Sequence, residues 1–299
     1  MFISASENLN PRRINADVAE AIAKISQDDL RGWVKWLSVP RHFTAQPRAN
    51  QEAREWIAGM LREWGYEVRI QGPFSNVIAL PRETDSPMVL IGAHYDSVGS
   101  TPGADDNASA VAAMLGCAKL FASLPWPPSV CFAAFNREED DLAGSRDFVT
   151  NDLPNADFTI AAAHILEMVG YASSAPGTQR IPEGLPIKIP DVGNFIAVLA
   201  NWRSNRHADA VLQTARSYLP EFPAKSLKVA LGLEHMFPVL SRSDHAPFWA
   251  ARIPALMWTD TSEYRNPHYH LPSDTPDTLD YTFLENVTKL LCAHLLNTQ

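Results

Sequence analysis

Residues 88–96, MVLIGAHYD, contain the pattern from which the fold can be predicted. The first six of these residues form an apolar run of strand length, and polar side chains follow at once. Two later runs repeat this pattern: residues 130–135 precede Glu138 and Glu139, and residues 160–166 precede Glu167. Continuous apolar strands are typical of a sheet that is buried on both faces. Because the carboxyl ends of parallel strands meet at one edge, we expect these polar side chains to converge there.

The segments around these runs show helical periodicity. Apolar spacing predicts helices within 15–64, from 107 to about 124, and at 142–149, 208–218, 245–251 and 282–296. Further strands are predicted at 66–71, 76–80, 195–199, 227–231 and 255–259. This alternation predicts one α/β domain over residues 1–299, a three-layer sandwich with a mixed, mostly parallel sheet and helices on both faces. Residues 1–49 are predicted to form a helical N-terminal extension that packs on it.

Composition argues against several classes of protein. The 299 residues include 25 Lys and Arg and 34 Asp and Glu, which gives a net charge of −9 and argues against nucleic-acid binding. No apolar run approaches the roughly 18 residues of a membrane-spanning helix. The first residues also lack an apolar stretch of signal-peptide length. We therefore expect a cytoplasmic protein without a membrane partner.

The three cysteines, Cys117, Cys131 and Cys292, lie in apolar contexts and far apart in the sequence. This spacing predicts core residues rather than a disulfide framework or a thiolate zinc site, and it suits a reducing compartment. The sequence contains no phosphate-binding Gly-Lys-Ser/Thr loop, Gly-x-Ser-x-Gly elbow, His-Glu-x-x-His or Cys-x-x-Cys motif.

The polar residues at the strand ends have the chemistry of metal ligands. His94 and Asp96 are two residues apart, so on an extended chain they point to the same side and the carboxylate can orient the imidazole. Glu167 follows an apolar run, where a carboxylate is costly to bury without a cation. Ordinary structural interpretations also exist: Asp105 and Asp106 could cap a helix, and Glu138 and Glu139 could form a solvated acidic turn.

A Pro-bounded loop at 265–275 adds His268, Tyr269 and His270. Such a loop can supply a metal ligand and a hydroxyl donor to an oxyanion. Spacing alone does not distinguish His268 from His270. Among the other histidines, His164, His207 and His294 are assigned to packing, and His42 and His235 are uninformative.

Six blocks of the sequence, taken in order, resemble the di-zinc aminopeptidases, whose relatives include glutamate carboxypeptidase, the glutaminyl cyclases and the non-catalytic transferrin receptor. The blocks are residues 94–97, 103–109, 135–145, 166–170, 243–248 and 269–270. The resemblance extends from about residue 50 to the end of the chain, and it implies a zinc-peptidase-like fold.

The resemblance also implies a role for each matching residue. His94 and Glu167 would hold one metal ion, Glu139 and His270 the other, and Asp106 would bridge both. Glu138 would be the general base and Tyr269 a donor to the oxyanion. Because the family's metal histidine follows such a tyrosine, the resemblance favours His270 over His268. Three further acids match residues that support the ligands: Asp96, Asp244 and Asp274. Glu167 stands where many members have Asp.

The resulting prediction is a metal-dependent exopeptidase, first of all an aminopeptidase, that hydrolyses the N-terminal amide bond of a peptide or small amide with two Zn²⁺ ions. Mn²⁺ or Co²⁺ would also suit these ligands. The alternative is a carboxypeptidase or an N-acyl-amino-acid amidohydrolase, with Arg203, Arg242 and Arg265 as candidate substrate contacts.

Two other classes are disfavoured. Glutaminyl cyclases carry Trp at the position of Tyr269 and use one zinc, and a metal-free binding protein would not need all five ligands and Glu138. The pocket walls are expected from residues 171–192 and 201–206, and the residues that could line the cleft include Trp202, Trp249 and Trp258. The sequence does not define the oligomeric state.

Overall fold

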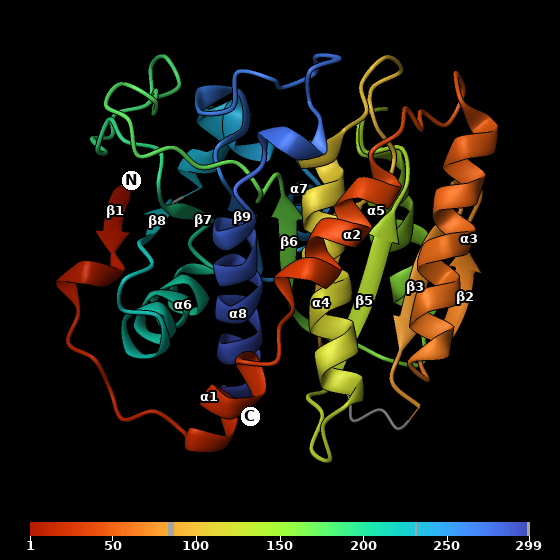
Figure 1. Ribbon diagram of the computed structural model, residues 1–299, viewed down its shortest axis with the longest axis horizontal. Coiled ribbons are helices and arrows are strands. Elements are labelled where there is room, and N and C mark those ends of the chain that lie inside the picture. Colours follow the sequence, from red (N-terminus) through yellow and green to blue (C-terminus); the bar gives the residue numbers. More distant parts are fainter. Residues whose placement is uncertain (83–86, 231, 298–299) are drawn as a thin grey trace.

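The computed structural model describes residues 1–82, 87–230 and 232–297. In this part of the chain, nine strands form one twisted sheet with helices on both faces, as Figure 1 shows. The strands are β1 (Phe2–Ala5), β2 (Glu67–Gln71), β3 (Asn76–Leu80), β4 (Met88–His94), β5 (Val130–Phe135), β6 (Ile160–Glu167), β7 (Ile196–Ala200), β8 (Ala224–Lys228) and β9 (Ala255–Thr259). The α/β prediction is confirmed.

α-Helices precede β2 and separate most of the strands from β4 onward. They are α1 (Ala16–Ile22), α2 (Gln27–Leu37), α3 (Pro47–Glu63), α4 (Ala110–Ala122), α5 (Ala143–Asp147), α6 (Asn205–Tyr218), α7 (His245–Ala250) and α8 (Tyr281–Asn297). No described helix has the length and apolar character that crossing a membrane would require.

The strand order is β1-β8-β7-β9-β6-β4-β5-β3-β2. Parallel pairing joins β5, β4, β6 and β9 in the centre and also joins β7 to β8. The remaining pairings, β1 with β8, β2 with β3, β3 with β5, and β7 with β9, are antiparallel. The predicted mixed sheet is confirmed. Parallel pairing predominates in its centre, whereas both flanks contain hairpins or reversed strands that need no crossover helix.

Two predicted boundaries differ from the structure. Residues 1–49 are not entirely helical, because Phe2–Ala5 forms the edge strand β1 beside β8. A four-residue strand is too short for its alternation to stand out in the sequence. The strand predicted at 227–231 begins earlier, as Ala224–Lys228, and residue 231 lies outside the described residues. Lys225 and Ser226 interrupt the apolar pattern there, which is why periodicity placed the strand too late.

The two faces of the sheet are covered differently. One face packs on α1, α2, α3, α4, α6 and α8, through a cluster that includes Leu30, Val111 and Leu291. The other face packs on α5 and α7 beside β3 to β6, as Figure 1 indicates. Over β9, β7 and β8 this second face is covered by loop residues such as Leu185 and Val239 instead of a long helix. This difference leaves room for a pocket.

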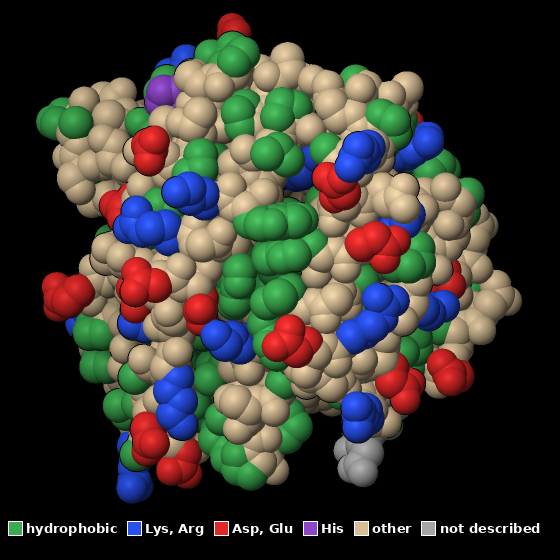
Figure 2. Space-filling view, turned by 45° about the vertical axis from the view of Figure 1, so that its right-hand side comes forward, with side chains coloured by type: hydrophobic (Ala, Val, Ile, Leu, Met, Phe, Trp, Pro, Cys, Tyr) green, Lys and Arg blue, Asp and Glu red, His purple; other side chains and the backbone are tan. Residues whose placement is uncertain are grey.

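Figure 2 shows the outer face near α2 and α3, where apolar side chains lie among charges of both signs. Trp36 from α2 is 44% exposed and stacks on Trp56 from α3, with ring centroids 4.4 Å apart.

Candidate metal centre

The five predicted metal ligands come together at one edge of the sheet. His94 is the last residue of β4, Glu139 follows β5, and Glu167 is the last residue of β6. Asp106 lies in the turn Ala104–Ser109, and His270 lies in the loop after β9. The expected convergence at the carboxyl ends of parallel strands is therefore what the structure shows.

Asp106 lies between the other ligands. Its Oδ1 is 3.4 Å from Nε2 of His94, and its Oδ2 is 3.1 Å from Nε2 of His270. On one side, Nε2 of His94 is 3.5 Å from Oε1 of Glu167; on the other, Nε2 of His270 is 3.4 Å from Oε2 of Glu139. One carboxylate thus faces two groups of potential ligands with its two oxygens, which is the arrangement of a bridging ligand.

Glu138 lies beside the first group. Its Oε2 is 3.9 Å from Nε2 of His94. One potential ligand atom each from Glu138, His94 and Glu167 lie within 4.8 Å of one another, close enough to hold one metal ion. The second cluster consists of Asp106, Glu139 and His270. Distance alone therefore does not separate Glu138 from the ligands, and its role as a base that is free of metal remains a proposal.

The donor set fits divalent metal ions. Both ring nitrogens of His94 and Oε1 of Glu139 are buried without a hydrogen-bond partner. Buried polar atoms are normally satisfied, so each such atom calls for an explanation. Imidazole and carboxylate are ligands that zinc accepts, and a cation between the two groups would satisfy these atoms.

The electrostatics of the cluster also call for cations. Burial alone would lower the pKa of His94, but the carboxylates of Glu167 and Glu138 raise it well above its usual value. Burial likewise opposes the charge on His270, yet Asp106 and Glu139 raise its pKa to about 10. Burial and the neighbouring Asp106 raise the pKa of Glu139 to about 7. In the metal-free protein the crowded carboxylates attract protons, and metal ions would replace those protons.

Asp96 and Asp274 support the ligands, each in a different way. Oδ1 of Asp96 lies 3.4 Å from Nδ1 of His94, and the same carboxylate accepts the backbone N–H groups of Glu138 and Glu139 at 3.2 and 3.4 Å. The carboxylate of Asp274 accepts the N–H groups of Asp105 and Asp106 at 2.9 and 3.1 Å. Both acids thus hold the backbone that carries metal ligands.

Asn107 does not begin the helix that the sequence predicted from residue 107. Its backbone is non-helical, the peptide bond before it is cis, and regular α-helix begins only at Ala110. Its side-chain amide donates to the carbonyl of Leu166 at 3.1 Å and accepts from the N–H of Met168 at 2.9 Å. Asn107 thereby fastens the Asp106 turn to the end of β6.

Arg41 is a supporting residue that sequence reasoning missed. It is fully buried, and its guanidinium donates to the carbonyls of Tyr95, Pro102 and Gly103 at 2.6, 2.6 and 3.0 Å. These carbonyls belong to the loop between His94 and Asp106. Burial lowers the pKa of Arg41 to about 10, and Asp106 and Asp96 oppose that shift. Its only sequence signal was a charged residue after a helix, which is ordinarily a surface feature.

Ser243 and Asp244 contact the first ligand group from the segment before α7. The Ser243 hydroxyl donates to Oε2 of Glu167 at 2.7 Å. Asp244 is fully buried, and burial raises its pKa to about 7. The block 243–248 suggested a contribution from Asp244, but nothing in the pattern identified Ser243 as a partner of Glu167.

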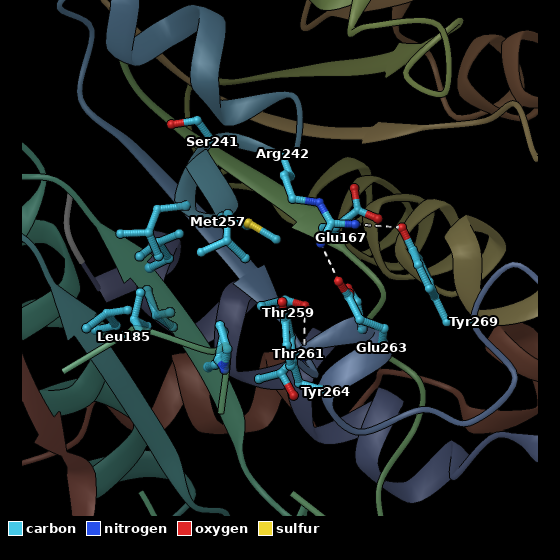
Figure 3. Close-up of a pocket in the computed structure, with 18 of the residues that line it drawn as sticks. Glu167, Leu185, Ser241, Arg242, Met257, Thr259, Thr261, Glu263, Tyr264 and Tyr269 are labelled. Atoms are coloured by element: carbon cyan, nitrogen blue, oxygen red, sulfur yellow. Dashed lines mark hydrogen bonds and ion pairs between the residues drawn. The ribbon is translucent and has the colours of Figure 1, made fainter. Parts of the chain in front are cut away.

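Tyr269 and Arg242 line the pocket near Glu167, as Figure 3 shows. The Tyr269 ring stacks on that of His270, with centroids 3.8 Å apart. Its hydroxyl accepts a hydrogen bond from Arg242 at 3.1 Å, and Arg242 also pairs with Glu263. Burial raises the pKa of the Tyr269 hydroxyl, so it remains protonated and able to donate.

These residues belong to a region that a known family model recognises. The model described as peptidase family M28 matches residues 76–295. The chain belongs to peptidase family M28. That span contains every predicted metal ligand, and the predicted family is confirmed.

Relatives of this M28 chain differ in how much of it they share. It is 35% identical to the uncharacterized protein YfbL of Escherichia coli K12, over 92% of this chain and 89% of YfbL. It is 28% identical to aminopeptidase YwaD of Bacillus subtilis, over 73% of this chain and 43% of YwaD. The chain therefore spans less than half the length of YwaD.

Two solved structures share the fold. The Legionella pneumophila LapA aminopeptidase matches with a TM-score of 0.76 and 18% identity, over 97% of this chain and 77% of LapA. The Porphyromonas gingivalis glutaminyl cyclase matches with a TM-score of 0.68 and 19% identity, over 92% of this chain and 99% of the cyclase. At these identities the likeness confirms the zinc-peptidase-like fold and nothing further.

In this M28 chain, a pocket of about 470 Å³ opens beside the cluster and is bounded partly by the loop predicted as a wall. Arg242 lines it, but Arg203 and Arg265 do not. Arg265 is buried, donates to the Gln179 side chain at 2.9 Å and stacks on Phe195. Arg265 therefore supports the pocket wall. The prediction that it contacts substrate is wrong, because its buried guanidinium is already in contact with Gln179 and Phe195.

The other expected wall residues also lie elsewhere. Of the segment 201–206, none of the residues lines the pocket, and neither do Trp202, Trp249 and Trp258. Trp202 is 53% exposed, whereas Trp258 is fully buried and donates to Nδ1 of His164 at 3.1 Å. These tryptophans pack or face solvent, which is the commoner role of the residue.

Neither His268 nor any of the three cysteines belongs to the ligand clusters found among the described residues. Nδ1 of His268 lies 3.0 Å from the Ser273 hydroxyl, outside both ligand clusters. All three cysteines are buried and unbridged. Cys117 on α4 and Cys292 on α8 nevertheless lie with their sulfur atoms 3.3 Å apart, a proximity that their separation in the sequence concealed.

Proposed function

We propose that this M28 family member is an aminopeptidase that works with two zinc ions. The observation that carries the proposal is the position of Asp106, whose two oxygens face His94 in one ligand group and His270 in the other. Sequence similarity to the aminopeptidase YwaD supports the same activity. Fold similarity to LapA is consistent with it.

When bound, two zinc ions would supply Lewis acidity that lowers the pKa of water and polarises the scissile carbonyl. The chain itself supplies the proton transfers. Glu138 lines the pocket beside the ligand group of His94 and is the group that takes a proton from the attacking water and returns it to the leaving amine. The backbone N–H of Glu138 donates a hydrogen bond to Asp96, which fixes the backbone position from which the Glu138 side chain extends.

Tyr269 supplies a donor to the carbonyl oxygen as negative charge develops on it. Its hydroxyl oxygen accepts from Arg242, so the O–H is left to donate to the substrate. A preorganised donor of this kind typically lowers the barrier by about 3–4 kcal/mol.

The charges around the pocket favour a substrate with a free amine over one with a free carboxylate. Among the described lining residues, the cations are Arg180, Lys225 and Arg242. Arg180 donates to the carbonyl of Glu263, Lys225 pairs with Glu7, and Arg242 pairs with Glu263. Each cation thus already has an acceptor. The carboxylates of the metal cluster, in contrast, make its surroundings attractive to an ammonium group.

The activity can be tested with leucine p-nitroanilide and its N-acetylated analogue. We expect zinc-dependent turnover of the free amine and none of the acetylated compound. Turnover of acylated substrates alone would favour the amidohydrolase instead. A glutaminyl peptide provides the third arm, since a cyclase would release ammonia and leave a pyroglutamyl peptide without freeing the amino-terminal residue.

A further inference from the structure

The pocket beside the cluster has a floor formed by four strands. The floor residues Met257 on β9, Leu199 on β7 and Leu227 on β8 are successive partners in the strand register, and Ile3 on β1 follows Leu227. All four line the pocket. Paired residues on adjacent strands present their side chains to the same face, so they form one apolar row across the sheet.

The face that carries this row is opposite the main helical layer. On β7, Ile196 and Val198 are fully buried in the core cluster beneath the helices, while Leu199 belongs to the second cluster on the other face. Loop side chains close over the row, including Leu185 and Ile187. Figure 3 shows Leu185 and Met257 on the side of the pocket away from Tyr269.

A second row connects this floor to the metal cluster. Glu167 on β6 pairs in register with Thr259 on β9, and Thr259 pairs with Ala197 on β7. Met257 lies two residues before Thr259 on the same strand face. The apolar row therefore starts next to the row that contains a proposed metal ligand. Since neighbouring strands are about 4.8 Å apart, the three spacings from β9 to β1 give a slot about 14 Å long.

The volume agrees with this length. The pocket measures about 470 Å³, within the range of about 300–1,000 Å³ that is typical of sites for drug-sized ligands. One aliphatic side chain of an ordinary peptide would leave most of that space unfilled.

The chemistry of the slot selects its occupant. A peptide backbone needs hydrogen-bond partners when it leaves water. The floor residues have apolar side chains. The backbone groups of their strands already bond neighbouring strands, on both sides for β7, β8 and β9 and on one side for the edge strand β1. An unbranched apolar chain needs no such partners. The ammonium group of the same substrate would remain at the acidic cluster.

We propose that the slot takes the side chain of the substrate's amino-terminal residue, and that the preferred substrates carry a linear apolar side chain longer than that of Leu or Met. This inference rests on the proposed aminopeptidase function. It assigns to Ile3, and so to the amino-terminal strand, a part in substrate selection.

The test uses zinc-loaded full-length protein and the p-nitroanilides of linear 2-amino acids with ethyl to octyl side chains. We expect kcat/KM to rise about fourfold per methylene beyond butyl, the fold-change that corresponds to ~0.8 kcal/mol for each buried methylene. A rise that stops at butyl would overturn the inference while leaving the aminopeptidase function intact. Turnover of no member would instead contradict the proposed function.

Two further arms locate the alkyl chain. Leucine alkylamides place the same chain on the leaving amine, and a length dependence in that series alone would overturn the inference. Differential scanning fluorimetry with the free 2-amino acids measures binding without turnover, and we expect the melting temperature to rise with chain length.

The variant Leu227→Trp fills the middle of the slot at a position three strands from β6. We expect the rise of kcat/KM with chain length to end at a shorter side chain in this variant than in the unaltered protein. Ile70→Trp is the matched control, because Ile70 is a part-exposed strand residue outside the pocket, on the far edge strand β2. The same shortening in both variants would contradict a specific role of the slot. If Leu227→Trp fails to fold, the alkyl series with the unaltered protein still decides.

Discussion

Arg242 donates a hydrogen bond to the hydroxyl oxygen of Tyr269 across 3.1 Å, although the two residues lie on different segments around the pocket. Glu263 holds the guanidinium from its other side. Arg242 was expected to contact a substrate carboxylate. The structure instead gives its guanidinium two protein partners, and one of them is the proposed oxyanion donor.

This contact predicts that Arg242 acts through Tyr269. Tyr269→Phe is expected to lower kcat about 10²- to 10³-fold, as loss of an oxyanion donor does. Arg242→Met should lower kcat about tenfold with little change in KM, because the donor stays but is no longer held. The double variant should be no slower than Tyr269→Phe. Steady-state kinetics on leucine p-nitroanilide measure this coupling, and losses that add fully would contradict it.

Metal content should follow the two ligand groups. The unaltered protein is expected to bind two zinc ions, His270→Ala one, and Asp106→Asn fewer than one, because Asp106 faces both groups. Plasma mass spectrometry of dialysed protein gives these ratios. His268→Ala is the matched control two residues from His270 and should retain two ions. Two ions in Asp106→Asn would remove its bridging role.

Glu138→Gln separates a base from a ligand. Glutamine has nearly the same shape but accepts no proton at neutral pH, so turnover should fall by at least 10²-fold. If Glu138 is free of metal, the variant should still bind two zinc ions. Loss of one ion together with activity would show that Glu138 belongs to the ligand cluster with His94 and Glu167.

Arg41→Ala should be strongly destabilising. Arg41 is fully buried and donates to the backbone carbonyls of Tyr95 and Gly103, at the two ends of the loop between His94 and Asp106. Removing one partner from a buried charged network typically costs about 3–5 kcal/mol. Urea unfolding of zinc-free protein measures this cost apart from metal binding. The exposed Arg48 provides the control, and Arg48→Ala should change the unfolding free energy by no more than about 0.5 kcal/mol.

His245 predicts part of the acid sensitivity. Burial lowers its pKa to about 4, and its Nε2 lies 2.9 Å from the carbonyl of Leu240. Between pH 6.5 and 4 the unfolded chain therefore binds a proton that the folded chain does not. The stability contributed by the neutral ring is complete above pH 6.5 and is lost as the pH falls through this window, by an amount on the order of 3 kcal/mol.

The variant His245→Gln should reduce the slope of unfolding free energy against pH between pH 6.5 and 4. Urea titrations at several pH values, in the presence of chelator, measure that slope. The exposed His235 is the control, and His235→Gln should leave the slope unchanged. An unchanged slope in His245→Gln would show that its ring does not titrate in this range.

The sequence predicted best those site residues that belong to a local pattern. His94, Glu139 and Glu167 each follow an apolar run, and the geometry of parallel strands brings such positions to one edge. The preference for His270 over His268 came from resemblance, since spacing did not separate them. The structure agrees, because only His270 lies in a ligand cluster.

What the sequence determined by itself was the set of ligand types and the sheet that carries them, because apolar runs and the residues that end them are local features of the chain. The tertiary structure alone decided which distant partners support that set: Arg41 under the Asp106 loop, Ser243 on Glu167, and Arg242 on Tyr269. It also decided that Ile3 joins the pocket floor and that Cys117 meets Cys292. Such contacts depend on how the layers pack and on which groups lose contact with water, and the spacing of neighbouring residues predicts neither.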